Sequence, residues 1–413
     1  MSVVIITNIK LLVNTRKENR LLRGKELAEL PCIENAYLII EDGTIAEYGS
    51  MGMLGQQDSE NTIDASGQMI LPAWCDSHTH LVFAASREEE FADKIKGLSY
   101  AEIAAKGGGI LNSARKLNET SESELLRMAM TRLNEVMQSG TGAIEIKSGY
   151  GLSVEGELKM LRVIKKLKEI SPIPVKATFL GAHTYPLEYK ENHQSYIDLI
   201  IREMLPVIEK EKLADYIDVF CETGFFSAEE TETICKAGIG YGLKPKIHAN
   251  QLNLSGGVET GVKLGALSVD HLETMDEKTI AALANSGTIG TLLPTAAFFL
   301  RMPFQPARQL IDAGCAIALA SDFNPGSSPS GNMNLVVAMS CIQMKMLPEE
   351  AINAATINGA YAMELEKELG SITVGKKANL IFTRPIPSLA YLPYAFGSNL
   401  IHKVMIEGEF IFS

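Results

Sequence analysis

Eight short apolar runs alternate with amphipathic stretches between residues 69 and 324 of this chain. The stretches between them, such as SESELLRMAMTRLNEVMQSG, space apolar residues by three and four and have Ser or Glu near their start, which is typical of helices. Eight strand-plus-helix units predict an α/β protein with a (β/α)8 TIM-like barrel. The runs cover residues 69–77, 142–150, 175–183, 216–222, 245–250, 267–273, 288–294 and 316–324.

The two ends of the chain differ from its middle in their sequence pattern. Short β-type runs broken by Asp-Gly and Gly-Gln turns occupy both the first seventy residues and the last forty. We expect residues 1–70 and 374–413 to form one small, discontinuous domain of β-sandwich type. The barrel would then span residues 71–373.

Composition excludes several classes of protein. The formal net charge is −12 and no Lys/Arg cluster stands out, so we expect no nucleic-acid partner. No run reaches the ~18 apolar residues of a membrane helix, and the N-terminus lacks a signal-peptide pattern. The six cysteines are scattered, which predicts buried, reduced thiols. A cytoplasmic protein without a membrane partner is the expectation.

Ionisable residues gather where the predicted barrel strands end. Chemistry in such barrels takes place at the C-terminal ends of the strands, and five of the seven histidines fall there. The residues at these ends are His78, His80, His183, His248, His271 and Asp322.

The first pair suggests a metal site. His78 and His80 point to the same side of a strand, although an isolated H-x-H pair is more often a solvated turn than a metal site. With His248 and Asp322 they make a set of three nitrogens and one oxygen, which suits Zn²⁺ or Fe²⁺ equally. The fourth strand ends in Cys221 and Glu222 rather than a lysine, so a second metal is not expected. We predict one zinc or iron ion per chain.

A single metal of this kind activates water for hydrolysis of an amide-like bond. In that case Asp322 takes the proton of the water, and His271 polarises the carbonyl or stabilises the oxyanion. The alternative for His271 is a hydrogen-bonded core histidine.

Several longer segments carry a family resemblance. DSHTHLVFAASREEEF, GLSYAEIAAKGGGILNSARK, GTGAIEIKSGYGL, SVDHLE and SDFNPGSSPS together resemble the imidazolonepropionases of the amidohydrolase superfamily. The resemblance implies hydrolysis of the cyclic amide of 4-imidazolone-5-propanoate to N-formimino-L-glutamate, a step of histidine degradation. It also implies a homodimer.

The resemblance assigns residues to this small-molecule substrate. Arg87 of the SREEE block would hold the propionate, since a planar guanidinium suits a carboxylate. Tyr150 and His183 would contact the substrate, and Tyr100 is a weaker candidate. The DFNPGSS block would present polar groups to the ligand from Asn324, Gly326 and Ser327.

One position departs from the family pattern. Many members carry a glutamate three residues beyond the histidine of the fifth strand, whereas this chain has Gln251. An amide can hydrogen-bond the imidazolone ring but cannot transfer a proton. The departure leaves substrate binding by Gln251 intact and puts a proton relay there in doubt.

Two other functions stay open at this stage. The chain could be another mononuclear amidohydrolase, such as a purine or pyrimidine deaminase, although Gln251 and Arg87 favour the cyclic amide. It could also be an inactive barrel that binds a small acid, although the complete set of metal ligands argues against that.

Overall fold

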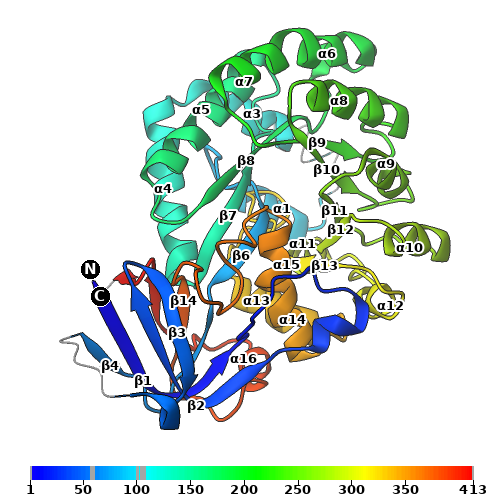
Figure 1. The fold of residues 1–413 in the computed structure, drawn as a ribbon. Helices are drawn as coiled ribbons and strands as arrows, with labels where there is room; N and C mark the ends of the chain where they lie inside the picture. Colours follow the sequence, from blue (N-terminus) through cyan, green and yellow to red (C-terminus); the bar gives the residue numbers. More distant parts are fainter. Residues whose placement is uncertain (1, 56–60, 99–101, 103–107, 412–413) are drawn as a thin grey trace.

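The computed structural model describes residues 2–55, 61–98, 102 and 108–411, and contains two sheets (Figure 1). One sheet is parallel, and its eight strands are hydrogen-bonded in sequence order. The strands are β6 (Trp74–Thr79), β7 (Thr141–Lys147), β8 (Val175–Ala182), β9 (Tyr216–Cys221), β10 (Lys244–Ala249), β11 (Ser268–His271), β12 (Ile289–Leu292) and β13 (Ile317–Leu319). Each of the eight predicted runs overlaps one of them, so the predicted barrel is confirmed.

The barrel nearly closes through the segment that follows its last strand. The backbone N–H of Asp322 donates to the carbonyl of His78, and that of His80 to the carbonyl of Phe323, each at 2.9 Å. Asp322 therefore lies beyond the end of β13 and is joined by its backbone to the end of β6. This junction brings the predicted ligands of the first and last strands together.

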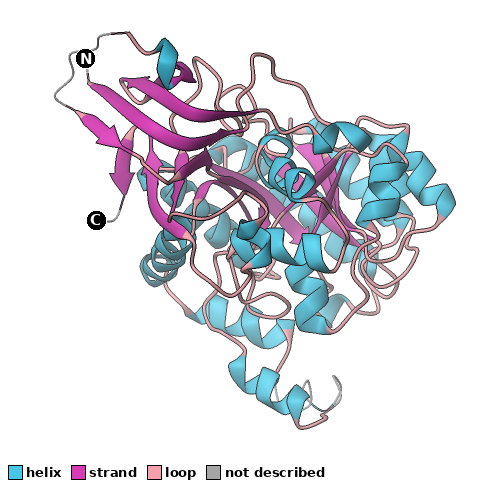
Figure 2. Ribbon diagram, turned by 90° about the horizontal axis from the view of Figure 1, so that it is seen from below, coloured by secondary structure: helices cyan, strands magenta, loops and turns pink. Residues whose placement is uncertain are grey.

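Helices surround the barrel (Figure 2). Serine caps begin several of them as the sequence predicts: the Ser121 and Ser153 side chains accept the N–H groups of Glu124 and Gly156. The helices are α1 (Glu88–Ile95), α3 (Ile110–Glu119), α4 (Glu122–Gln138), α5 (Val154–Ile170), α6 (His193–Leu199), α7 (Leu205–Glu211), α8 (Ala228–Gly240), α9 (Gly257–Leu264), α10 (Glu277–Ala284), α11 (Pro294–Leu300), α12 (Ala307–Asp312), α13 (Met333–Ile342), α14 (Pro348–Ala355), α15 (Ile357–Tyr361) and α16 (Tyr391–Tyr394). Short helical turns cover Gly24–Ala28, Met51–Met53, Leu187–Tyr189 and Ile200–Met204.

Strands from both chain ends form the second sheet, next to which both termini lie (Figure 1). A separate hydrophobic cluster includes Ile6, Leu38, Ile70 and Phe382. The separate β unit from both chain ends is therefore confirmed, and we propose residues 1–70 with 374–413 as its extent. The strands are β1 (Val3–Val13), β2 (Cys32–Glu41), β3 (Thr44–Ser50), β4 (Thr62–Asp64), β5 (Met69–Pro72), β14 (Leu380–Thr383), β15 (Ile401–Ile406) and β16 (Glu409–Ile411).

The first predicted run, residues 69–77, holds parts of two strands rather than one. The backbone N–H of Ala73 donates to Asn379 in the end sheet, and that of Trp74 donates to Gly140 beside the barrel. Pro72 has no N–H to continue a ladder, which suits a change of sheet at this point. An unbroken apolar run cannot reveal such a change.

The six cysteines are free thiols, and four are buried. The prediction of burial is wrong for Cys32, which is exposed at the first residue of β2, and Cys341 is half-buried. No helix in the described part of the chain combines the length and the apolar character that a membrane crossing requires.

Candidate metal centre and active site

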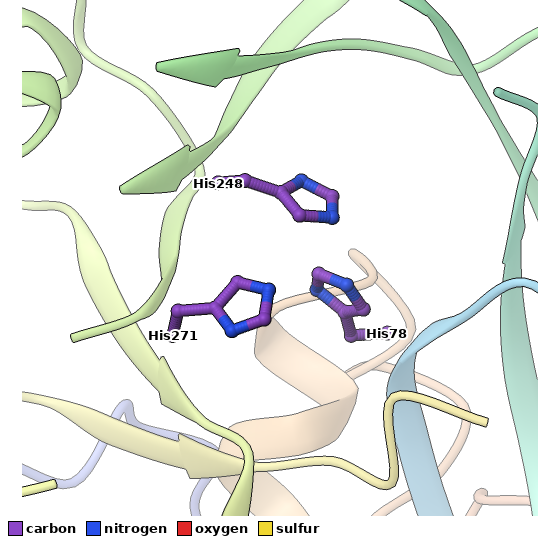
Figure 3. Close-up of side chains that lie close together, drawn as sticks. All are labelled: His78, His248 and His271. Atoms are coloured by element: carbon purple, nitrogen blue, oxygen red, sulfur yellow. The ribbon is translucent and has the colours of Figure 1, made fainter. Parts of the chain in front are cut away.

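Three histidines from three barrel strands converge in the barrel. His78, His248 and His271 point toward one another (Figure 3). One ring nitrogen from each lies within 4.8 Å of the others, and all three residues are buried. The ring centroids of His78 and His248 are 4.5 Å apart, and those of His248 and His271 are 5.1 Å apart. These three rings can therefore face one ion.

A second group shares His78 with the first. The Nε2 atoms of His78 and His80 lie 3.6 Å and 3.5 Å from Oδ1 of Asp322. Asp322 has a positive φ of 51°, which places its carboxylate just past β13. The structure thus brings together all four predicted metal ligands, and it adds His271 to the same cluster.

The ring nitrogens are arranged as a metal site requires. The Nδ1 atoms of His78 and His248 lie 2.6 Å from Asp270 and 2.9 Å from Asp218. Carboxylates accept these bonds, so each Nε2 carries the lone pair, and neither Nε2 has a hydrogen-bond partner among the described residues. Unpartnered buried acceptors are rare in folded proteins. The donor set therefore fits a metal ion.

Burial keeps these imidazoles neutral. It lowers the pKa of His78, His80 and His248 well below the ordinary value, and neighbouring positive groups lower it further. A neutral imidazole is the form that binds a metal.

A buried network of charges supports the two histidine partners. The Lys147 ammonium lies 2.8 Å from Asp218 and 3.5 Å from Asp270, and it also donates to Glu145 at 2.6 Å. Lys246 pairs with Glu145 from the other side. Although burial raises the pKa of Asp270, Lys147 and Lys246 outweigh it and keep that pKa below its ordinary value. Asp270 is therefore an ionised acceptor for His78.

Asp322 and His271 have pKa values suited to proton transfer. Burial raises the pKa of Asp322 to about 7, before any metal is considered. Burial also lowers the pKa of His271, but the carboxylate of Glu273, 3.6 Å from its Nδ1, more than offsets this and raises the pKa overall. A protonated His271 can donate a hydrogen bond to a carbonyl oxygen.

A cavity of about 80 Å³, partly open to solvent, adjoins the cluster. That volume is smaller than the ~300 to 1,000 Å³ usual for small-molecule sites. Five of the residues predicted to contact substrate line it, namely Tyr150, His183, Gln251, Asn324 and Ser327. Phe220 also lines the cavity and supplies an apolar surface.

Arg87 is not among the residues that line this cavity, and it lines a second cavity together with Asn112 and Lys116. Its guanidinium is 5.9 Å from the ring centroid of Tyr150, and its Nε donates to Ser113 at 2.9 Å. Its buried Nη2 has no hydrogen-bond partner among the described residues, so this donor can serve an anion. At Gly326 a Cβ atom would lie 2.7 Å from Nη1 of Arg87, so the glycine makes room for the guanidinium.

Side chains hold two loops at the cavity through hydrogen bonds to their backbone N–H groups. Asn324 Oδ1 accepts the N–H groups of Gly326 and Ser327, and its Nδ2 donates to Ser327 Oγ and to the Asp322 carbonyl. The Asn324 side chain therefore shapes its loop, and a direct substrate contact from it stays a prediction. Glu222 accepts the N–H groups of Leu252 and Asn253, next to Gln251.

Sequence reasoning missed the residues below the metal cluster. Asp218 and Asp270 stand inside the apolar runs YIDVF and LSVDHLE, and Glu145 and Lys147 alternate in GAIEIKS. A charged residue at every second position of a buried strand is a usable signal for an inward-facing network. Tyr100, the weaker candidate for substrate contact, lies outside the described residues.

Solved structures share the fold. A 5-methylcytosine deaminase from Klebsiella pneumoniae matches with a TM-score of 0.75 at 16% identity, covering 99% of this chain and 97% of that one. An Escherichia coli guanine deaminase matches with a TM-score of 0.74 at 13% identity, covering 100% and 99%. At such identities the likeness concerns the fold alone.

Sequence relatives are far more similar. The Amidohydrolase family model matches residues 69–411. Imidazolonepropionase of Flavobacterium johnsoniae is 61% identical over 99% of this chain and 100% of its own length. Those of Christiangramia forsetii and Thermoanaerobacter pseudethanolicus are 56% and 42% identical, over 99% and 92% of this chain and 100% and 91% of their own lengths. The chain therefore belongs to the amidohydrolase family and, within it, to the imidazolonepropionases.

Proposed function

We propose that this chain hydrolyses the cyclic amide of 4-imidazolone-5-propanoate to N-formimino-L-glutamate in histidine degradation. Water adds across the ring C–N bond: a C–O bond forms, the C–N bond breaks, and the ring nitrogen receives a proton. The observation that carries the proposal is a buried imidazole cluster that fits a metal, with the Arg87 guanidinium 5.9 Å from the ring centroid of Tyr150 in the cavity beside that cluster. The relatives named for this activity support it.

His78, His80, His248 and Asp322 would hold one metal ion, either zinc or iron. A bound ion of this kind lowers the pKa of water toward 7 and polarises a carbonyl oxygen. The extra histidine near the cluster, His271, would face the substrate instead, because Glu273 favours its protonated form. The family match and the free Nε2 atoms support a metal-dependent reaction.

The other residues of the proposed site each have a separate role in proton transfer, substrate binding or orientation. Asp322 accepts a proton from water and passes it to the leaving ring nitrogen. His271 donates a hydrogen bond to the carbonyl oxygen, where negative charge develops. Arg87 binds the propionate carboxylate, and Tyr150, His183 and Gln251 orient the ring. Asn324, Gly326 and Ser327 complete the polar wall.

The test is turnover of freshly generated imidazolonepropionate, followed as the loss of its ultraviolet absorbance. Guanine, adenosine and cytosine serve as deaminase substrates in parallel. Rapid loss of imidazolonepropionate with none of the other reactions supports the proposal. Turnover of a deaminase substrate alone would contradict it.

We also propose that the protein works in the cytoplasm as a homodimer, without nucleic acid or membrane partners. The net charge of −12 supports the absence of a nucleic-acid partner. Light scattering of the purified protein tests the dimer, and a monomeric mass would overturn it.

A further inference from the structure

A buried glutamate outside the cavity holds the loop that presents Tyr150. Glu157 lies on α5 and is 0% exposed. Its Oε1 accepts the N–H groups of Gly151 at 2.6 Å and Leu152 at 3.1 Å, and its Oε2 accepts the N–H of Gly149 at 3.0 Å. One carboxylate therefore binds the backbone on both sides of Tyr150.

The loop needs this external support because its backbone is unusual. Gly149 has φ of 113°, and Leu152, which is not a glycine, has φ of 49°. A glycine adopts a positive φ without strain, but a residue such as Leu152 keeps one only where surrounding contacts fix it. The loop also packs directly on α5, since a Cβ atom at Gly151 would lie 2.2 Å from the backbone nitrogen of Glu157.

The same loop orients a second residue of the cavity. The Gly149 carbonyl lies 2.9 Å from Nδ1 of His183. A carbonyl oxygen only accepts, so this bond places the His183 proton on Nδ1 and leaves Nε2 as an acceptor. A shift of Gly149 would therefore change both the position of His183 and the nitrogen that it offers.

We propose that Glu157 is a positioning residue for the substrate, acting through Tyr150 and His183. It touches neither the cavity nor the candidate metal ligands. The inference rests on the proposed function for its substrate, but the fixed conformation of residues 149–152 can be measured without substrate. The loss of Glu157 should weaken substrate binding and leave the metal in place.

The informative variant is Glu157→Gln. Its amide nitrogen must face backbone N–H donors, so at least one buried donor loses its acceptor. We expect amide hydrogen exchange of the peptide spanning residues 148–153 to speed up at least about tenfold in the metal-loaded protein, because fewer of its N–H groups are held. Glu155→Gln, an exposed change on the same helix, is the matched control and should exchange as the wild type does.

Kinetics supply the second measurement. With imidazolonepropionate as substrate, Glu157→Gln should raise KM about ten- to a hundredfold, the range for a lost hydrogen bond to a charged group, with kcat changed far less and the metal content unchanged. Combined with Tyr150→Phe, its effect should be smaller than the product of the two single effects, because both act at one contact. Independent effects that multiply would overturn the inference.

Two further outcomes keep the test decisive. If Glu157→Gln does not fold, Glu157→Asp keeps the charge on a shorter side chain and should show intermediate exchange at residues 148–153. Wild-type exchange in either variant overturns the positioning role. If the wild-type protein does not turn over imidazolonepropionate, the proposed function fails, while the exchange experiment still decides whether Glu157 fixes the loop.

Discussion

The Nδ1 atom of His78 lies 2.6 Å from Oδ2 of Asp270, although the two residues are 192 positions apart in the sequence. This contact selects the nitrogen that His78 turns toward the cavity. Asp218 does the same for His248 at 2.9 Å, and Lys147 links the two carboxylates. The orientation of His78 and His248 is thus set by carboxylates that bond to their Nδ1 atoms.

Asp270→Asn should weaken metal binding about ten- to a hundredfold, the usual effect of losing such a supporting carboxylate. The amide can still accept from Nδ1, but it no longer carries the charge that stabilises the bound histidine. Competition with a chelator, followed by metal analysis, measures the change. Asp312→Asn, at an exposed position, is the control. Equal metal retention in both variants would show that the Asp270 contact is dispensable.

Arg87→Ala should raise KM for imidazolonepropionate while the metal stays bound. Losing a charge-assisted contact removes roughly 1.5 to 3 kcal/mol, about ten- to 150-fold in binding. Steady-state kinetics measure this change, and Arg115→Ala, an exposed change on α3, should behave as the wild type does. An unchanged KM in Arg87→Ala would show that Arg87 does not bind the substrate carboxylate.

Substitutions at Gln251 test which residues transfer the proton during hydrolysis. If Gln251 only hydrogen-bonds the ring, Gln251→Glu should keep turnover within a few-fold, and Gln251→Ala should lose the ~0.5 to 1.5 kcal/mol of a neutral hydrogen bond. Asp322 and His271 would then carry the proton alone. Measured kcat values for both variants decide the matter. A hundredfold rise in kcat for Gln251→Glu would show that an acid is needed at this position.

The buried histidines should make the metal-free protein lose stability as the pH falls below about 6.5, the ordinary pKa of the side chain. Burial holds the pKa of His78, His80 and His248 well below 6.5 in the folded chain. Below that pH the unfolded chain therefore binds more protons than the folded chain does. Each of these histidines then lowers the free energy of unfolding by up to roughly 1.4 kcal/mol per pH unit as the pH falls.

Urea unfolding at several pH values measures this loss in the free energy of unfolding. His248→Gln should show a shallower dependence on pH, because one of the buried rings is gone. His402→Gln, which changes an exposed histidine, should retain the wild-type slope. Equal dependence on pH in the wild type and in His248→Gln would mean that the His248 ring takes up a proton in the folded chain as readily as in the unfolded chain.

The pattern of apolar residues predicted the barrel and the gathering of ionisable residues at its strand ends. This was possible because the periods of two in strands and 3.6 in helices can be recognised within short segments. They could not predict the contacts of Asp218 and Asp270, which depend on strand register and on packing across the barrel. His248 pairs with Asp270 in the register of β10 and β11, yet the Asp270 side chain reaches His78 on β6. The change of sheet at Pro72 was hidden for the same reason, since it depends on Asn379 and Gly140.

The most direct test of the account is to titrate metal-free protein with zinc or iron and to follow the turnover of imidazolonepropionate. In the proposed site, His78, His80, His248 and Asp322 would hold one ion. Turnover should therefore be absent at first, rise in proportion to the metal added, and stop rising at one ion per chain. Full turnover without metal, or a rise that continues to two ions per chain, would contradict the account.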